Sequence, residues 1–383
     1  MAFADHYRQI YMKGLAGERP DPPIDWGELE QAAEAAMGEA AADYVFACAG
    51  SGDTARANRE AFRSRRIVPR MLRDVSERDL AVELLGTAMP APVLLAPIGV
   101  HSLAHPEGER ATARAAAAVG VPMVVSTAAD TPLEAIAEEA GELPLWYQLY
   151  WPNDDDITRS LISRAEAAGY RAIVLTVDTF IPGWKPRDLQ RADLPFLRGV
   201  GVAQFFSDPV FRSQLERPPE EDIGAAVGHF LAIYVNPALT WEHVSKLVEM
   251  TSLPVVIKGI LHPDDAREAR ERGADAIVVS NHGGRQVDGS IASLEALPDV
   301  VGAVGDDLAV LLDSGVRSGA DALKALALGA RAVLLGRPYI WGLALGGEAG
   351  VEEILRRFLG ELDLSLALSG YRTPAELGPE ALR

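Results

Sequence analysis

The stretch VVIKGILHPDDAREARERGADAIVVS, residues 255–280, contains the repeating pattern that decides the fold. Its first four residues form a β-branched run that ends in Lys258, residues 264–272 have helical spacing, and residues 277–280 form a second β-branched run. Gly273 stands where a helix often ends in a left-handed conformation. Two short apolar runs joined by one helix are typical of a βαβ unit with parallel strands.

The same pattern extends from residue 92 to the last third of the chain. The strand-like runs are residues 93–96, 123–126, 145–150, 173–178, 255–258, 277–280, 310–313 and 333–336. Helical segments are expected at residues 107–119, 132–140, 154–168, 240–250, 264–272, 294–303 and 319–328, with further glycines at their ends, Gly120, Gly141, Gly169 and Gly329. Eight such runs predict an α/β fold, a closed (β/α)8 TIM barrel.

We expect one domain that covers residues 1–383, because α/β barrels of this size fold as single units. The barrel is expected at residues 91–345. Residues 1–90 are expected to form an N-terminal helical extension, with helices at 26–37 and 52–62. Residues 346–383 are expected to form a C-terminal helix, at 352–368, and a tail.

One interval is too long for a simple connection. Residues 179–239 follow the fourth strand and contain seven prolines with scattered aromatic residues, so little regular structure is predicted there. A long loop in a compact domain is usually functional or mobile. We interpret it as an active-site lid, and subunit contact is the alternative.

Composition and charge exclude several classes of function. The formal net charge of −19 opposes binding to nucleic acid or to an anionic membrane surface. A single cysteine, Cys48, cannot form an intrachain disulfide, and no run of about 18 apolar residues predicts a membrane span. His101 and His105 are four residues apart, but Pro106 interrupts the helix that would place them on one face, so no metal site is predicted. A cytoplasmic enzyme is expected.

Polar residues gather where the predicted strands end, which is where barrel enzymes place their chemistry. Asp178, Lys258, His282 and Arg285 all follow apolar runs. An arginine can clamp a carboxylate with two hydrogen bonds, and a histidine supported by an aspartate can move a proton. A buried lysine at a strand end can serve as a stabilising cation or as a Schiff-base nucleophile, and the sequence leaves both open.

The seventh and eighth strand ends have the composition of a phosphate site. Gly315, Arg317, Gly336 and Arg337 lie where many barrels bind phosphate through loop amides and a helix N-terminus. Tight turns with surface arginines are the alternative. Asp313 can pair with an arginine or hold hydroxyl groups, so a ribityl phosphate would fit this end.

These motifs together resemble the FMN-dependent α-hydroxy-acid oxidoreductases. The matching stretches are SNHGGRQ at 280–286, KGI at 258–260, DSGVR at 313–317, LGRP at 335–338, LTVDT at 175–179, YQLY at 147–150 and AHPEGE at 104–109, together with Tyr44, Thr54 and Asn58. The resemblance covers nearly the whole chain and implies an enzyme that uses FMN to oxidise a small L-2-hydroxy acid. It also implies a homo-oligomer, a tetramer or an octamer.

The resemblance assigns a role to each site residue. His282 would take a substrate proton while Asp178 supports the imidazolium, and Lys258 would stabilise negative charge on the reduced flavin. Substrate contacts are expected from Tyr44, Tyr150, Lys185, His282 and Arg285. Cofactor contacts are expected from Pro97, Ile98, Gly99, Ser126, Gln148, Thr176, Lys258, Ser280, Asp313, Gly315, Arg317, Gly336 and Arg337.

Within the family, the stretches PRDL at 186–189, PFLRG at 195–199, DPVF at 208–211 and WG at 341–342 most resemble lactate 2-monooxygenases. That resemblance implies oxidation of L-lactate with O2 and conversion of the retained pyruvate into acetate, carbon dioxide and water. Ala128 stands where some relatives have a bulkier residue, which widens the expected pocket. The alternatives are an oxidase or dehydrogenase acting on lactate, mandelate or a similar acid and releasing the keto acid, a catalytically silent flavin-binding barrel, and an aldolase-like barrel without flavin.

Overall fold

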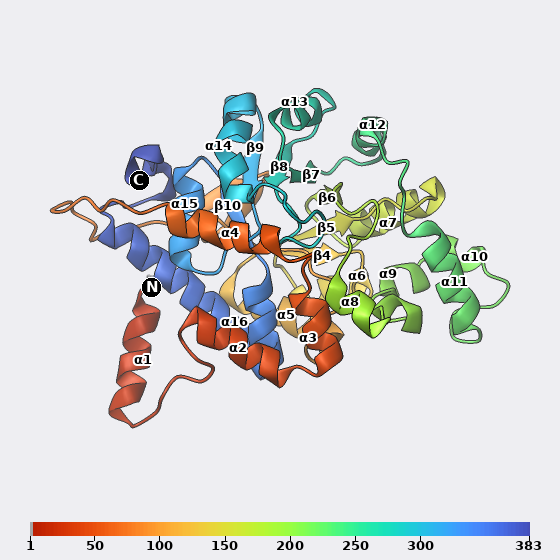
Figure 1. Ribbon diagram of the computed structural model, residues 1–383, viewed down its shortest axis with the longest axis horizontal. Helices are drawn as coiled ribbons and strands as arrows, with labels where there is room; N and C mark the ends of the chain where they lie inside the picture. The colour runs from red at the N-terminus through yellow and green to blue at the C-terminus, as the bar shows by residue number, and fades with distance from the viewer. Residues whose placement is uncertain (1–2) are drawn as a thin grey trace.

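The computed structural model describes residues 3–383 and contains a closed barrel of parallel strands (Figure 1). The strand order around the barrel is β10-β3-β4-β5-β6-β7-β8-β9, so neighbours in sequence pair and β10 closes onto β3. The strands are β3 (Val93–Leu95), β4 (Met123–Ser126), β5 (Leu145–Leu149), β6 (Ile173–Thr176), β7 (Val255–Ile260), β8 (Ala276–Val279), β9 (Ala309–Leu312) and β10 (Ala332–Leu335). The prediction of a TIM barrel is confirmed.

The helices of the barrel units lie outside the strands (Figure 1). They are α5 (Gly108–Val119), α6 (Leu133–Ala140), α7 (Asp155–Ala167), α12 (Trp241–Met250), α13 (Pro263–Glu271), α14 (Ser293–Val304) and α15 (Gly319–Ala327), close to the expected bounds. Gly120 and Gly273 follow α5 and α13 by one and two residues, with φ of 78° and 88°. This left-handed conformation ends a helix at little cost only for glycine.

The inside of the barrel is a packed core and not a pore. Alternate residues of the strands point inward and form one buried cluster, which includes Leu94, Val124, Trp146, Val174, Val256, Val278, Leu311 and Leu334. A small antiparallel hairpin, β1 (Val82–Leu84) and β2 (Thr87–Met89), adds Leu84 and Met89 to this cluster. The N-terminal extension is therefore not wholly helical, because this hairpin supplies apolar side chains to the barrel interior.

The extension also contains more helices than the sequence predicted. The four are α1 (Asp5–Leu15), α2 (Trp26–Ala36), α3 (Glu39–Phe46) and α4 (Asp53–Ser64), of which only α2 and α4 were expected. Asp25 caps α2 by accepting from the backbone N–H groups of Gly27 and Glu28 at 2.9 and 3.0 Å. The C-terminal end of α3 lies at the opening of the barrel, where Tyr44 and Val45 line the cavity described below.

The C-terminal helix α16 (Arg337–Leu368) begins directly after β10 and is longer than expected. Gly346 and Gly347 have non-helical backbone angles and divide it at a kink, close to the expected end of the barrel at residue 345. Its second half packs among α1, α2 and α15, and Figure 1 shows it running beside the N-terminal helices. Among residues 3–383 no helix is both long enough and apolar enough to span a membrane.

The segment of residues 179–239, interpreted above as a lid and called the lid below, contains more regular structure than the sequence predicted. It holds α8 (Pro186–Arg191), a 3-10 turn η2 (Pro195–Arg198), α9 (Ala203–Phe206), α10 (Pro209–Ser213) and α11 (Ile223–Ile233). The expectation of an irregular segment was wrong because three prolines that suggested it, Pro186, Pro195 and Pro209, each stand at the start of a helix or turn. Proline is well tolerated there, since the first N–H groups of a helix have no internal partner.

Candidate active site

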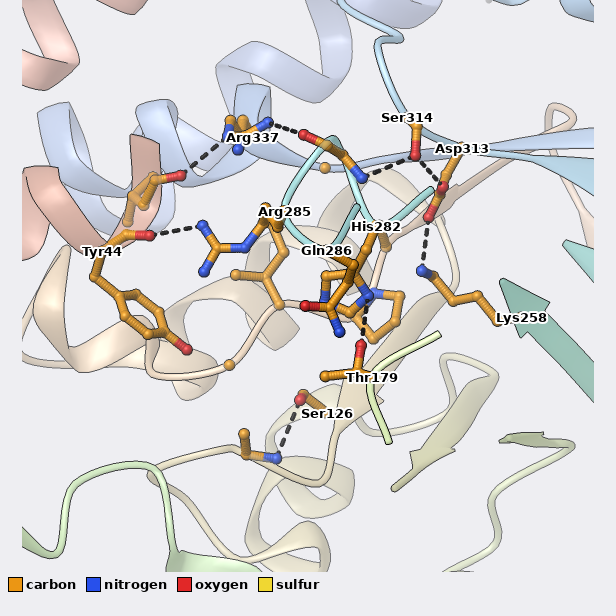
Figure 2. Close-up of a pocket in the computed structure, with 18 of the residues that line it drawn as sticks. Tyr44, Ser126, Thr179, Lys258, His282, Arg285, Gln286, Asp313, Ser314 and Arg337 are labelled. Carbon is orange, nitrogen blue, oxygen red and sulfur yellow. Dashed lines mark hydrogen bonds and ion pairs between the residues drawn. The ribbon is translucent and has the colours of Figure 1, made fainter. Parts of the chain in front are cut away.

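The barrel opens into a cavity of about 250 Å³ at the C-terminal ends of its strands (Figure 2). Fifteen of the predicted site residues line it: Tyr44, Pro97, Ile98, Gly99, Ser126, Tyr150, Lys185, Lys258, His282, Arg285, Asp313, Gly315, Arg317, Gly336 and Arg337. The other predicted residues, Gln148, Thr176, Asp178 and Ser280, lie behind this lining and contact it. The predicted residues therefore gather at one place, although they come from most of the length of the chain.

His282 and Asp178 form the pair that the sequence suggested. The Nδ1 atom of His282 lies 2.9 Å from Oδ1 of Asp178, and the hydroxyl of Thr179 donates to the same carboxylate oxygen at 2.9 Å. His282 has a φ of 57°, which is uncommon for a residue other than glycine. Such backbone strain is typical of functional positions, and here it turns the imidazole toward the cavity.

The pair is set up as a neutral base beside an anion. Burial lowers the pKa of His282 and Asp178 raises it, while Lys258 and Arg285 lower it further, so that the pKa lies below its ordinary value and the imidazole is neutral near pH 7. Burial raises the pKa of Asp178, but His282 and Lys258 outweigh burial and hold that pKa below its ordinary value. A neutral imidazole with an ionised carboxylate behind it can accept a proton and keep the resulting charge stabilised.

Lys258 is buried at the end of β7 as a cation. Its Nζ lies 3.1 Å from Oδ2 of Asp313 and 3.1 Å from the hydroxyl of Ser280. Burial lowers the pKa of Lys258, but Asp313 and Asp178 together raise it above its ordinary value. A protonated amine is not a nucleophile, so this geometry favours a charge-stabilising role over a Schiff base. Asp313 pairs with Lys258 and not with the arginines beside it in sequence.

Arg285 presents part of its guanidinium group to the cavity. Its Nη1 donates to the carbonyl oxygens of Tyr44 and Ala47 at 2.8 and 3.1 Å, while Nε and Nη2 have no partner among residues 3–383. The guanidinium also lies over the Tyr44 ring, 5.3 Å from its centroid. Two free N–H directions on a fixed planar group match the geometry of a carboxylate.

Three further residues complete this end of the cavity. Burial raises the pKa of Tyr44 to about 12, so its phenol stays protonated and can donate a hydrogen bond. Burial likewise raises the pKa of Tyr150, whose ring lies 5.8 Å from that of Tyr234 in the lid. Lys185, also from the lid, donates to the carbonyl of Gly183 at 3.3 Å and lies 3.7 Å from Asp188. Burial and Arg285 lower the pKa of Lys185.

The cavity wall contains two further arginines, Arg317 and Arg337. Arg317 lies over the ring of Trp341, with 5.1 Å from its Cζ to the ring centroid, and its Nη1 donates to the carbonyl of Val316. Arg337 donates to the carbonyls of Val45, Ala47 and Gly283 at 3.0, 3.0 and 3.2 Å. Neither arginine forms an ion pair with a carboxylate among the described residues. Two buried cations without a protein counter-ion suit a phosphate.

FMN fits the polar groups that surround the cavity. Gln148 Nε2, Thr176 Oγ1 and Arg317 Nε are buried and have no hydrogen-bond partner among residues 3–383. An unpaired buried polar group costs about 1–3 kcal/mol, so these three atoms indicate a missing ligand. The edge of a flavin ring has hydrogen-bond acceptors and one donor, which match the amide of Gln148 and the hydroxyl of Thr176. The phosphate of FMN matches the guanidinium of Arg317. Ser126 accepts from the N–H of Ala128 at 3.1 Å, beside the same wall.

The structure adds residues that the sequence did not single out. Ser314 has a φ of 72° and donates to Asp313 at 2.8 Å, while its oxygen accepts from the N–H groups of Asn281 and Gly283. It therefore ties the loop after β8 to the loop after β9. Phe196 and Tyr234 line the cavity from the lid. Ser314 and Phe196 lie inside stretches quoted above and could have been found there, whereas Tyr234 follows no periodic signal.

Comparisons with known proteins agree with this geometry. The family model described as FMN-dependent dehydrogenase matches residues 33–383. An FMN-dependent alpha-hydroxy acid dehydrogenase of Schizosaccharomyces pombe is 46% identical, over 98% of this chain and 95% of that protein. An L-lactate oxidase of Lysinibacillus sphaericus is 44% identical, over 94% of this chain and 92% of that protein.

A solved structure supports the same conclusion. The crystal structure of mandelate oxidase with (S)-4-hydroxymandelic acid has a TM-score of 0.84 at 37% identity, and the match covers 94% of this chain and 98% of that one. These three relatives are named as oxidases or dehydrogenases, and none of the three is named as a lactate monooxygenase. The chain belongs to the FMN-dependent α-hydroxy-acid dehydrogenase and oxidase family, and it is an FMN-dependent 2-hydroxy-acid oxidoreductase.

Proposed function

We propose that the protein is an L-2-hydroxy-acid oxidase that converts a small aliphatic substrate, with L-lactate as the best candidate, into its 2-keto acid. Two electrons pass to O2, which leaves as hydrogen peroxide. The observation that carries the proposal is the placement of Arg285, with two unused N–H directions, in the same cavity as the His282–Asp178 pair. The similarity to a lactate oxidase supports the choice of substrate and acceptor.

Arg285 and Tyr44 would hold the substrate carboxylate. Arg285 is fixed by the carbonyls of Tyr44 and Ala47, so little side-chain freedom is lost when the carboxylate binds. The Tyr44 phenol supplies one further donor. Lys185 lies on the lid side of the cavity and would add a second positive charge near that carboxylate when the lid is in place.

His282 would accept the proton of the substrate hydroxyl, or the α-proton if that proton leaves first. Asp178 would then stabilise the imidazolium at the Nδ1 hydrogen bond of 2.9 Å. FMN, when bound, would accept the two electrons of the substrate and would pass them on to O2. Lys258 would hold a positive charge beside the place where negative charge develops, and Asp313 keeps that amine protonated.

The apolar part of the cavity sets the size of the substrate side chain. Ala128 and Ile98 line it from the barrel, and Phe196 and Tyr234 line it from the lid. A small side chain at Ala128 leaves room, whereas the two aromatic rings close the other side. A methyl group would fit with little loss of contact, and an aryl group would have to displace part of the lid.

Monooxygenation is the second candidate, and the packed lid is the observation that favours it. Phe196, Phe230 and Tyr234 pack against one another with tilted rings whose centroids lie 4.5–5.8 Å apart, so the lid forms a cohesive cover. A cover that opens slowly would retain pyruvate together with peroxide. The products would then be acetate, carbon dioxide and water, formed from one lactate and one O2.

An anaerobic substrate panel tests the proposal. L-lactate, glycolate, L-2-hydroxybutyrate and mandelate would be mixed with the FMN-loaded enzyme, and bleaching of the flavin absorbance would be followed. We expect L-lactate to bleach the flavin fastest. Bleaching by mandelate alone would overturn the substrate assignment, and bleaching by none of the four would overturn the proposed site.

Aerobic product analysis separates the two candidates. An oxidase releases one pyruvate and one hydrogen peroxide for each O2 consumed, whereas a monooxygenase releases acetate and no peroxide. We expect pyruvate and peroxide in equal amounts. A reduced flavin that O2 does not reoxidise would instead identify a dehydrogenase with another electron acceptor.

A further inference from the structure

Three arginines form a positively charged row along one wall of the cavity. Arg285, Arg337 and Arg317 have no carboxylate within ion-pair distance among residues 3–383, although most other arginines that lie this deep in the protein have one. Both Arg285 and Arg337 donate to the carbonyl of Ala47, so the two guanidinium groups lie close enough to repel each other. Burial lowers the pKa of Arg337, and Arg285 lowers it further. Burial and Arg337 lower the pKa of Arg317 to about 9. The row therefore lacks negative charge at both of its ends.

The C-terminal end of α3 holds two of these arginines. The carbonyls of Tyr44 and Ala47 accept from Arg285 at 2.8 and 3.1 Å, and the carbonyls of Val45 and Ala47 accept from Arg337 at 3.0 Å each. Figure 2 shows Arg285 and Arg337 beside this segment, on the side of the cavity where Tyr44 lies. The last carbonyls of a helix have no partner within it and carry its partial negative charge. Ala47 is thus a shared acceptor.

The third arginine is linked to the same segment by stacking. Phe46, between the residues just named, stacks on Trp341 with a centroid distance of 6.4 Å and an interplanar angle of 6°. Trp341 also contacts the guanidinium of Arg317, whose Cζ lies 5.1 Å from the ring centroid. A shift of residues 44–47 would therefore move the acceptors of Arg285 and Arg337 and the support of Arg317 together.

We propose that Arg337 and the C-terminal end of α3 are positioning groups that couple the two anion sites of the cavity, so that a phosphate at Arg317 and Arg337 strengthens carboxylate binding at Arg285. The inference rests on the proposed function, because that function assigns the carboxylate to Arg285. Arg337 itself does not have to touch the carboxylate. It acts through Ala47 and through its charge.

The coupling has a simple electrostatic origin. Two cations that share one carbonyl repel each other, and an anion bound to either of them reduces that repulsion for the other. A phosphate also fixes Arg337, which fixes the position of the Ala47 carbonyl and so the orientation of Arg285. Coupling between two binding sites is reciprocal and commonly amounts to roughly 5–150-fold in affinity. We expect a value near the lower end, roughly 5–20-fold, because no large movement is required.

The first experiment compares two flavins. The deflavinated protein would be reconstituted with FMN or with riboflavin, which has the same ring but no phosphate, and pyruvate would be titrated while the flavin absorbance is recorded. We expect the pyruvate Kd to be roughly 5–20-fold weaker with riboflavin. Inorganic phosphate at constant ionic strength should restore the tighter Kd, and chloride should not. Equal Kd values for the two flavins would overturn the proposal.

The second experiment uses FMN alone and does not depend on riboflavin being retained. Arg337→Lys keeps the charge but cannot maintain the three carbonyl contacts, so we expect a weaker pyruvate Kd at saturating FMN. Arg59→Lys is the matched control, because Arg59 contacts Asp321 at 2.8 Å near the same end without touching residues 44–47. An unchanged pyruvate Kd in Arg337→Lys would overturn the proposal, as would equal weakening in both variants.

These measurements separate the coupling from the proposed function. Both use pyruvate binding without turnover, whereas the function is tested by the bleaching of FMN with L-2-hydroxy acids. Bleaching by L-lactate together with equal Kd values would leave the function in place and remove the coupling. Absence of bleaching by every hydroxy acid would remove the function even if phosphate and pyruvate still bound cooperatively.

Discussion

The rim of the barrel and the lid enclose the same cavity but are built on different principles. The rim presents charged and hydrogen-bonding groups, such as His282, Lys258 and Arg285, each fixed by a neighbour at about 3 Å. The lid contributes mainly aromatic and aliphatic side chains, such as Phe196 and Tyr234, held by packing. Under the proposed function, the rim would determine the chemistry, and the lid would determine which substrates enter and how long the product stays.

The two regions also differ in how closely their backbone is specified. Behind the rim, Gly259 has a φ of 116°, and a Cβ atom there would lie 2.8 Å from the Cβ atom of Asp178. Only glycine allows Asp178 to approach so closely. The lid meets the N-terminal extension through half-exposed ion pairs, such as Arg187 with Glu34 at 2.8 Å. Exposed pairs contribute little, about 0–1 kcal/mol. The lid is held to the barrel instead by buried groups such as Gln204, whose side chain accepts from the N–H of Leu133 at 2.9 Å and donates to the carbonyl of Thr131 at 2.8 Å.

The largest effect is expected from the rim. His282→Ala removes the proton acceptor while leaving the cavity wall intact, so we expect the rate of flavin reduction by L-lactate to fall by roughly 10²–10⁴-fold. Stopped-flow absorbance under anaerobic conditions measures this rate. The variant should remain yellow, because none of the expected phosphate contacts involve His282. Reduction at the wild-type rate would show that the base lies elsewhere.

The contrast between rim and lid also explains what the sequence could predict. The eight strands and their polar ends follow from period and position, because the strand runs are mainly apolar and most of them end in polar residues or are followed by them. That pattern alone is enough to place Lys258, His282 and Arg285 at one opening of the barrel. The assignment of FMN needed the family resemblance, since strand ends rich in glycine and arginine indicate only a phosphate.

The parts that could not be predicted depend on tertiary contacts. The prolines of the lid suggest irregular chain, yet Pro186 and Pro209 start helices, and only packing decides between these outcomes. The hairpin at residues 82–89 is too short for a periodic signal, and it forms because Leu84 and Met89 complete the barrel interior. The pairing of Asp313 with Lys258 likewise joins two strand ends that are far apart in sequence.

A smaller effect is expected from the core of the lid. Phe230 is fully buried and contacts Phe205 and Tyr234 with centroids 4.9 and 4.5 Å apart. Phe230→Ala creates a cavity that costs about 3 kcal/mol, which would reduce the closed fraction of the lid by up to roughly a hundredfold. We therefore expect pyruvate to bind up to about a hundredfold more weakly, while the reduction rate at saturating L-lactate changes much less.

A variant outside the lid controls for general destabilisation. Leu247 in α12 is also fully buried, but it lies outside the lid segment, residues 179–239. We expect Leu247→Ala to lower the Tm without changing the pyruvate Kd. If Phe230→Ala and Leu247→Ala weakened pyruvate binding equally, the lid would have no separate role in retention.

The smallest effect is expected in the pH dependence of flavin reduction. A substitution in the rim should shift this pH dependence, and a substitution in the lid should not. Burial lowers the pKa of His282 below the ordinary value of a histidine. The imidazole is therefore neutral, and able to accept a proton, at neutral pH, and it becomes protonated only in more acidic solution. The second-order rate of flavin reduction should therefore be flat from about pH 6.5 to 8 and fall about tenfold per pH unit below the pKa of His282. Asp178 raises the pKa of His282, so Asp178→Asn should move the fall in rate to lower pH and should lower the rate at neutral pH. Phe230→Ala should leave the pH at which the rate falls unchanged. A fall that begins above pH 7, or one that does not move in Asp178→Asn, would show that the titrating group is not the His282–Asp178 pair.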